Sequence, residues 1–485
     1  MEVDCWANQP RLWLGGHAGS ASVSLWEEDG GSLKKILNFD EEARKEAGAN
    51  YLGRWSGGFG DKVICDARRG QLYFHPWGCL GGGRAAVFDM KTGGFLFWVE
   101  LRAAMDDIAF DKRGHLHCQF NNLEQMRNAV GRLDPSRKQY AECPYDYGEE
   151  GEYIAKGWIG VLATWSQHKF SDGIGVNMMG DVAVVNGIYR APRMDDLEGL
   201  FKSTRMEGKR AGTDDAAHES FIRNIREMEK RGVQQYYIPR RPGLASIGET
   251  IWTFDRSGEL RQESAVIAPF LLNGVQLDED GRLYFAQCAT KVVNGKPFLQ
   301  GRGGNFGCEK PLVAANRNPL TGTFIKSRPK DVRLLLKNAS IPLDADQLPK
   351  RPYDANSIGK GPGWWEGTEW LYAGASPAVD TDVSACECPQ LRSHLDWYKR
   401  SFVPEAYRHS IGVLDTNGNL IMHLGRYGNF DDAGRMKPGD ADIALTMPRF
   451  ISGTDNYLAF SDWGERLVAL KIAYEAEETV GIGNQ

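Results

Sequence analysis

The sequence predicts an all-β fold in which four-stranded units repeat around a ring, and three observations support this prediction. First, a hairpin phrase recurs: an apolar run, an acidic or amide residue, a turn and a second apolar run. Second, another apolar phrase precedes nearly every copy, so hairpins come in pairs. Third, the cleanest copies, at Asp89 and Asp134, lie 45 residues apart, a spacing typical of one propeller blade.

The hairpin phrase alternates apolar and polar residues on both sides of a Gly, Asn or Ser turn, as β-hairpins do. Its copies are AVFDMKTGGFLFWV from Ala86, VGRLDPSRKQY from Val130, IWTFDRSGEL from Ile251, VAANRNPLTGTFI from Val313 and IGVLDTNGNLIMHL from Ile411. The preceding phrases span Ala67–Trp77, Asp111–Phe120, Asp278–Cys288, Gly367–Ser376 and Gly453–Trp463. Such a unit buries its faces only against neighbouring units, so the units are expected to close into a β-propeller.

The paired phrases predict seven four-stranded blades in a single propeller domain over residues 1–485, with six or eight blades as alternatives because the first copy is degenerate. The pairs fall at about residues 11–39, 62–101, 107–145, 174–267, 275–327, 369–424 and 450–480. The fifty-seven glycines suit the many tight turns of such a fold, and the 14 tryptophans suit large rings packed between blades. The longer intervals must carry insertions, which a propeller accommodates as loops on its two flat faces.

Three insertions interrupt the repeat. Residues 191–243 are highly charged and predict a helical excursion within blade four, with a helix inside 195–232 whose apolar stripe includes Phe221, Ile225 and Met228. That helix either lies across a propeller face or serves as a partner-docking arm. Residues 328–365 predict a long ordered loop rich in Pro and Lys, and residues 380–408 predict a cysteine-containing loop.

Charge and hydropathy exclude two classes of partner. The chain has 58 basic and 64 acidic residues, a net charge of −6, whereas a nucleic-acid surface needs a basic face. No apolar run approaches the roughly 18 residues of a membrane span, so we expect neither nucleic acid nor membrane as a partner. The N-terminal sequence shows no export signal. This is expected of a cytoplasmic protein, of a chain from which an upstream domain has been trimmed, or of an extracytoplasmic protein whose signal has been removed, and we favour the last.

The nine cysteines concentrate at Cys386 and Cys388, with His394 six residues further on. A turn at Pro389 would aim both thiolates at one ion, and these three residues with a fourth ligand would hold zinc or iron. The alternatives are disulfides to partners such as Cys308 or Cys79, and ordinary packing.

Polar residues gather where the expected strands end on one face of the propeller. Loops between the second and third strands of each blade share that face with the crossings between blades, and the face surrounds the axial channel. The candidates are His75, Trp77, Asp106, Asn121, Asn273, Gln287, Arg449, Asp462 and Trp463. Asp and Asn are also ordinary turn formers, and Asp462 could simply brace its own blade through backbone hydrogen bonds.

Apolar strands and turns recur at Ser410–Asn429, Leu445–Phe450 and Tyr457–Leu470, and the last of these contains DWGER from Asp462. These segments resemble the NHL-repeat and gluconolactonase-like superfamily of propellers, whose Asp-x-x-Asn-x-Arg element begins at Asp462 here, with Glu465 in the Asn position and Arg466 one residue before the Arg position. The resemblance implies a propeller fold. For an enzyme it also implies Ca²⁺ or Mg²⁺ near the axis.

Under that resemblance, Asp106, Asn273 and Asp462 would supply oxygen ligands to the ion. His75 would be the general base and Arg449 the clamp for an anionic group.

Two functions follow as hypotheses. In the first, the axial face recognises a glycan or a protein, and Trp77, Trp463, Trp364 and Trp365 supply flat apolar faces for sugar rings or partner side chains. In the second, the chain is a metal-assisted lyase or hydrolase acting on an acidic sugar or lactone. Neither a P-loop, a Rossmann fingerprint nor a CxxCH haem motif occurs, so we expect no nucleotide and no haem.

Overall fold

We describe the fold from a computed structural model of the chain. The structure describes residues 2–4, 11–15, 23–29, 32–38, 62–66, 69–75, 83–89, 95–101, 105–111, 114–123, 127–134, 141–142, 173–189, 242–244, 247–269, 272–298, 322–339, 341–357, 361–375, 391–405, 408–428, 443–445, 448–453, 457–462 and 466–471. Within these residues every regular element is a β-strand, as the repeat predicts. No helix in this part has the length and apolar character of a membrane span.

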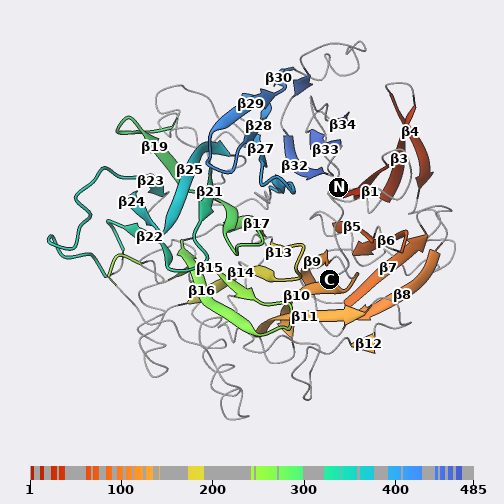
Figure 1. Cartoon of the computed structure of the whole chain (residues 1–485), viewed down its shortest axis with the longest axis horizontal. Coiled ribbons are helices and arrows are strands. Elements are labelled where there is room, and N and C mark those ends of the chain that lie inside the picture. Colours follow the sequence, from red (N-terminus) through yellow and green to blue (C-terminus); the bar gives the residue numbers. More distant parts are fainter. Residues whose placement is uncertain are drawn as a thin grey trace, which may run out of the picture.

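Successive strands pair antiparallel in sheets that follow the order of the chain (Figure 1). The first three sheets consist of β1 (Glu2–Asp4), β2 (Arg11–Gly15), β3 (Val23–Asp29) and β4 (Ser32–Asn38); of β5 (Lys62–Asp66), β6 (Gln71–His75), β7 (Gly83–Asp89) and β8 (Phe95–Leu101); and of β9 (Met105–Phe110), β10 (Leu116–Leu123), β11 (Arg127–Asp134) and β12 (Ala141–Glu142). The next two are built around β13 (Ile174–Val176), β14 (Val182–Tyr189), β15 (Ile247–Phe254) and β16 (Leu260–Ala268); and β17 (Leu272–Leu277), β18 (Leu283–Gln287), β21 (Gly322–Ser327) and β25 (Thr368–Ala375). The last two consist of β26 (His394–Leu395), β27 (Ser401–Glu405), β28 (Ser410–Leu414) and β29 (Leu420–Leu424); and of β32 (Pro448–Gly453), β33 (Tyr457–Asp462) and β34 (Arg466–Lys471).

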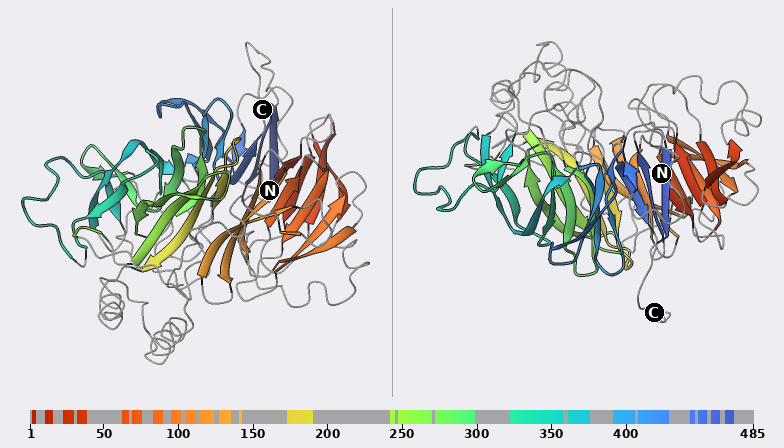
Figure 2. Two further views of the ribbon diagram at one scale, coloured as in Figure 1. Left: turned by 60° about the horizontal axis from the view of Figure 1, so that its bottom comes forward. Right: turned by 90° about the horizontal axis from the view of Figure 1, so that it is seen from above.

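The sheets form a closed, propeller-type ring. The first strands β1, β5, β9, β13 and β17 contact one another in succession, β25 contacts β27, and β27 contacts β32. The ring closes because β32 also contacts β1, the first strand of the chain. Figure 1 shows the blue C-terminal sheet beside the red N-terminal sheet, and the side view in Figure 2 shows strands running across the thickness of the ring.

Hairpin turns between the first and second strands lie on one face of this ring. In the described turns of this kind, an Asp or Asn side-chain oxygen accepts a backbone N–H two to four residues later, for example Asp66 from Arg69 N at 3.2 Å and Asp278 from Arg282 N at 2.9 Å. Side chains also link a turn to its neighbour: Asn177 Nδ2 donates to Asp278 O at 3.1 Å, and Lys399 Nζ pairs with Asp280 at 2.8 Å. These links join neighbouring sheets on the face opposite the predicted axial site.

The insertions differ from the predicted loops where they are described. Residues 328–365 contain β22 (Val332–Leu336), β23 (Ala355–Ser357) and β24 (Gly361–Glu366), and β22 pairs in parallel with β16. With β19 (Thr290–Val293) and β20 (Lys296–Pro297), they widen the β13–β16 sheet outwards. Residues 391–405 of the predicted cysteine loop form β26 and β27. The predicted helix at 195–232 lies outside the described residues.

The packed core is continuous between the β13–β16 and β17–β25 sheets. Val266 and Ile251 from the first sheet and Phe285 and Ile325 from the second belong to one cluster of buried side chains. Leu334 on the widened edge joins the same cluster, so the added strands share the core of the ring. Two short strands, β30 (Arg426–Tyr427) and β31 (Ala444–Leu445), pair in parallel beyond β29.

Candidate functional site

The predicted site residues on the second strands occupy equivalent positions. His75, Gln287 and Asp462 are each the last residue of the second strand of a sheet. Each pairs with the first residue of the neighbouring first strand: His75 with Lys62, Gln287 with Leu272, and Asp462 with Pro448. Antiparallel order therefore puts all three at the same face of the ring.

The predicted residues on the first strands show the same equivalence. Asp106, Asn273 and Arg449 are each the second residue of a first strand, β9, β17 and β32 respectively. The first strands start at the face where the second strands end, so these three positions share the face of His75, Gln287 and Asp462. Asn121 lies near the end of β10, beyond an irregularity in its pairing with β9. Trp77 and Trp463 lie outside the described residues.

Gln287 has a bracing role that the sequence did not reveal. Its side chain is buried, its Nε2 donates to Pro269 O at 3.1 Å, and its Oε1 accepts Ala289 N at 2.6 Å. These bonds hold the crossing from β16 to β17 against the end of β18. The amide is thus used within the fold rather than presented to a ligand, and Asn273 is buried beside the same crossing.

The expectation that Trp364 and Trp365 offer exposed faces needs correction. Both are buried in β24, away from the ring of first strands. Trp364 Nε1 donates to Arg351 O at 3.0 Å, and the Trp365 ring lies 6.1 Å from that of Phe285. Trp365 joins the common core because β24 pairs with β22, a pairing that the loop prediction did not include. Trp364 packs instead against Tyr353, with the ring centroids 4.7 Å apart.

A carboxylate that the sequence analysis missed lies at an equivalent strand end. Glu405 ends β27, the second strand of its sheet, and is 0% exposed. Tyr372 OH donates to its Oε1 at 2.6 Å and Ser410 Oγ to its Oε2 at 2.8 Å, while His423 Nδ1 lies 2.7 Å from Oε2. Arg408 Nε is 3.4 Å from Oε1. We call these five residues the Glu405 cluster.

Backbone geometry makes room for the Glu405 cluster. A Cβ on Gly412 would lie 2.9 Å from Tyr372 OH and 3.2 Å from Glu405 Cδ, so a larger residue would displace the pair. Burial and the Glu405 carboxylate raise the pKa of Tyr372, which keeps the phenol a donor. Glu405 could have been found from its position in the sequence, because FVPE, like QLYFH, is a short apolar run that ends in a titratable residue. It was missed because residues 380–408 were predicted to form a cysteine-containing loop.

A second buried carboxyl lies near the crossing from β16 to β17. Glu249 in β15 accepts the backbone N–H of Leu272, the first residue of β17. Its Oε1 has no hydrogen-bond partner among the described residues. Burial raises the pKa of Glu249 to about 8, and the Leu272 N–H only partly opposes this shift. The side chain is therefore a neutral acid at pH 7.

His394 is the described member of the predicted metal site, because Cys386 and Cys388, like Cys79 and Cys308, lie outside the described residues. Its ring centroid lies 5.9 Å from that of Phe402 in β27, with the two rings tilted by 35°. Burial and the Arg400 guanidinium lower the pKa of His394 to about 4. The imidazole is thus neutral at pH 7, which is the form that binds metal ions.

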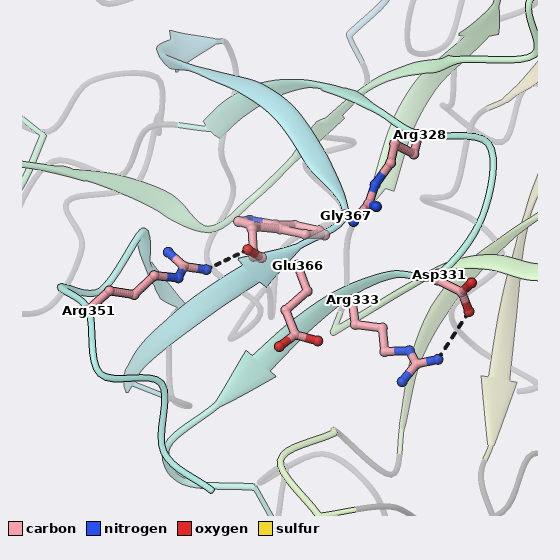
Figure 3. A pocket seen from close by; sticks show the side chains of 7 residues that line it. Arg328, Asp331, Arg333, Arg351, Glu366 and Gly367 are labelled. Carbon is pink, nitrogen blue, oxygen red and sulfur yellow. Dashed lines mark hydrogen bonds and ion pairs between the residues drawn. The ribbon is translucent and has the colours of Figure 1, made fainter.

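An open hollow of about 500 Å³ lies over β22 and β24 at the widened edge (Figure 3). It is lined by Arg328, Asp331, Arg333, Arg351, Trp365, Glu366 and Gly367. Arg351 is bound by Asp354 at 2.5 Å and Arg333 by Asp331 at 3.3 Å. Acids within the fold therefore already neutralise two of its three arginines, so its charge favours no particular ligand.

Comparison with known proteins gives structural likenesses only. No family model and no curated protein matches the sequence. Virginiamycin B lyase from Staphylococcus aureus is similar in structure over 97% of this chain and 94% of its own, with 10% identity and a TM-score of 0.37. A gluconolactonase from Xanthomonas campestris is similar over 85% of each chain, with 11% identity and a TM-score of 0.34.

The similar structures also include an isolated β-propeller domain. The β-propeller domain of Cps50 (Swd1) from Myceliophteria thermophila covers 95% of this chain and 94% of its own, with 9% identity and a TM-score of 0.38. The similar structures thus include a gluconolactonase, the class named by the sequence resemblance. At these identities and TM-scores the likenesses assign no activity to this chain.

Proposed function

We propose that the chain is a seven-bladed propeller that binds a glycan or a protein ligand on its axial, loop-rich face. The blades would be the β1–β4, β5–β8, β9–β12, β13–β16 and β26–β29 sheets, the sheet of β17, β18, β21 and β25, and the β32–β34 sheet. The succession of contacts from β1 round to β32 supports this count.

One observation carries the proposal: polar strand ends recur in register on one face. His75 and Asp462 end second strands, and Asp106 and Arg449 are the second residues of first strands. A scaffold needs only turn-forming residues at such positions, whereas a binding face needs donors and acceptors converging from several blades. Arg449 directly follows Pro448, the pairing partner of Asp462, so a cation and an anion lie on adjacent strands there.

The test compares the two faces of the ring. His75→Ala and Asp462→Ala change the axial face, whereas Asp280→Ala changes an exposed turn on the opposite face and serves as the control. Binding would be measured on an array of neutral and acidic glycans, with the melting temperature of each variant as a check on folding. We expect a glycan bound by the wild type and by Asp280→Ala to be lost or weakened at least about tenfold by either axial substitution.

Equal binding by all three variants would contradict an axial site. Absence of any bound glycan would leave a protein as the ligand. The supporting result would then be a cross-link from position 462 to a protein in cell extract. That cross-link should be lost in His75→Ala and kept in Asp280→Ala.

A metal-assisted lyase or hydrolase is the second candidate, because Asp106, Asn273 and Asp462 bring oxygen ligands of the kind Ca²⁺ prefers to equivalent strand ends. If an ion binds there, it would polarise an anionic substrate, with His75 as base and Arg449 holding the negative group. A rise in melting temperature with Ca²⁺ that chelator reverses and Asp462→Asn removes would favour this candidate. If zinc or iron were instead bound by Cys386, Cys388 and His394, Cys386→Ser should reduce the amount of metal that the protein binds.

A further inference from the structure

The two ring nitrogens of His423 have different surroundings. Nδ1 lies 2.7 Å from Oε2 of the buried Glu405 carboxylate. No residue that the structure describes forms a hydrogen bond with Nε2, and 34% of the His423 side chain is exposed. A carboxylate only accepts hydrogen bonds, so Nδ1 carries the proton and Nε2 of the neutral imidazole presents a lone pair. His423 is therefore held in the tautomer that a general base needs.

The carboxylate that orients His423 is itself fixed. Tyr372 OH donates to its Oε1 at 2.6 Å, and Ser410 Oγ donates to its Oε2 at 2.8 Å. Gly412 pairs with His423 across the sheet, and its lack of a side chain leaves room for Tyr372 and Glu405. Because other donors hold the carboxylate in place, the hydrogen bond to Nδ1 fixes the direction of the imidazole. A base oriented by a third group in this way is a recurring catalytic arrangement.

Arg408 is a neighbour of the imidazole. Its Nε lies 3.4 Å from Glu405 Oε1, the other oxygen of the carboxylate that binds His423. The guanidinium lies over the half-buried Phe298 ring, 5.2 Å from its centroid, and 43% of the Arg408 side chain is exposed. Glu405 already balances the charge of Arg408, so this place favours an uncharged substrate over an anion. The guanidinium N–H groups suit a carbonyl oxygen, and Phe298 supplies an apolar surface.

We propose that His423 is the general base of a perimeter site that hydrolyses uncharged carboxylic esters. A water molecule bonds through its oxygen to the ester carbonyl carbon and gives a proton to His423 Nε2. The bond from that carbon to the alcohol oxygen then breaks, and the proton returns from Nε2 to the alcohol. The products are a carboxylic acid and an alcohol.

The neighbours of His423 have different roles in this reaction. Glu405 is a positioning residue, because it acts through the imidazole. Arg408 donates to the carbonyl oxygen as negative charge develops there. His423 lies on β29, the outermost strand of the β26–β29 sheet, so the proposal does not depend on the axial site.

The probe is p-nitrophenyl acetate, whose hydrolysis by the full chain is followed through the absorbance of nitrophenolate. We expect saturable hydrolysis, with a rate that falls at acidic pH because a protonated imidazole cannot act as a base. His423→Gln keeps an N–H donor for Glu405 but has no base. Its kcat should be at least about tenfold lower with little change in KM, and its fall in rate at acidic pH should disappear. Free imidazole added to His423→Ala should restore part of the rate, which a purely structural histidine would not allow.

His115→Gln is the matched control. His115 Nδ1 also contacts a carboxylate, Asp111 Oδ2 at 3.3 Å, but on the opposite face of the ring. His115→Gln should keep the wild-type rate, and the melting temperature of each variant checks its folding. Glu405→Gln removes the acceptor for Nδ1 and should lower kcat as well. A rate that rises linearly with ester concentration, equal rates for the wild type and His423→Gln, or equal losses in His423→Gln and His115→Gln would overturn the proposal.

Discussion

Two buried glutamates show how strongly local partners decide the state of a side chain. Glu405 is contacted by Tyr372, Ser410, His423 and Arg408, so its negative charge is compensated inside the protein. Glu249 is also buried, but the hydrogen bond that it accepts comes from one backbone N–H, and it is held as the neutral acid. Neither environment could be predicted from sequence, because the partners come from other strands and from a neighbouring sheet.

Glu249 should make the protein less stable as pH rises. Its pKa is about 8 in the folded chain against an ordinary value near 4.3 when unfolded, so between these values only the folded state keeps the proton. Stability is then greatest below the unfolded pKa and falls by up to about 1.4 kcal/mol per pH unit until pH passes the folded pKa.

Urea unfolding of the wild type and of Glu249→Gln across that pH range measures this effect. Gln keeps an acceptor for Leu272 N and has no proton to lose. We therefore expect Glu249→Gln to be more stable than the wild type at pH 7, by roughly 3 kcal/mol. Parallel pH profiles for the two proteins would show that Glu249 ionises normally in the folded state.

The Glu405 cluster should behave as a coupled unit. Tyr372→Phe removes one hydrogen bond to a buried charge and should cost about 2 kcal/mol, whereas Glu405→Gln leaves several donors poorly matched and should cost about 3 kcal/mol or more. Because both changes affect the same network, the double variant should cost less than the sum of the two. Strict additivity in chemical unfolding would contradict a shared network.

At the scale of elements, the hairpins were the most predictable features. The phrases from Ile251 and Ile411 form β15–β16 and β28–β29, since alternation and turn chemistry act within a few residues. The strands β22–β24 were not predicted, because β22 depends on parallel pairing with β16, which is distant in the chain. The burial of Trp365 follows from that pairing and was missed for the same reason.

The turn between β28 and β29 should be sensitive to a single methyl group. Gly418 has a φ of 81°, and a Cβ there would lie 2.5 Å from the Trp370 ring. Gly295 has a similar φ of 77° with nothing within 4 Å. Gly295→Ala should therefore cost about 1 kcal/mol for the backbone alone, and Gly418→Ala at least about 2 kcal/mol because packing is also disturbed. Similar melting temperatures for the two variants would contradict the Trp370 contact.

At the scale of the whole molecule, the repeat predicted a ring but not what closes it. Closure depends on β32 contacting β1 across nearly the whole length of the chain, and the degenerate first copy left the number of blades open. The face assignment followed from antiparallel order alone, and the structure puts His75, Asp462, Asp106 and Arg449 at equivalent strand ends. Side-chain roles at Gln287 and Glu405 required the packing of neighbouring sheets.

Closure of the ring is the claim on which the axial face depends, and hydrogen exchange tests it most directly. Val3→Pro removes a backbone donor from β1 and should loosen the β1–β4 sheet. In a closed ring, amide protection should fall in β5 and also in β32, while β17 on the far side keeps its protection. Loss of protection in β5 with β32 unchanged would show that the first and last sheets do not meet.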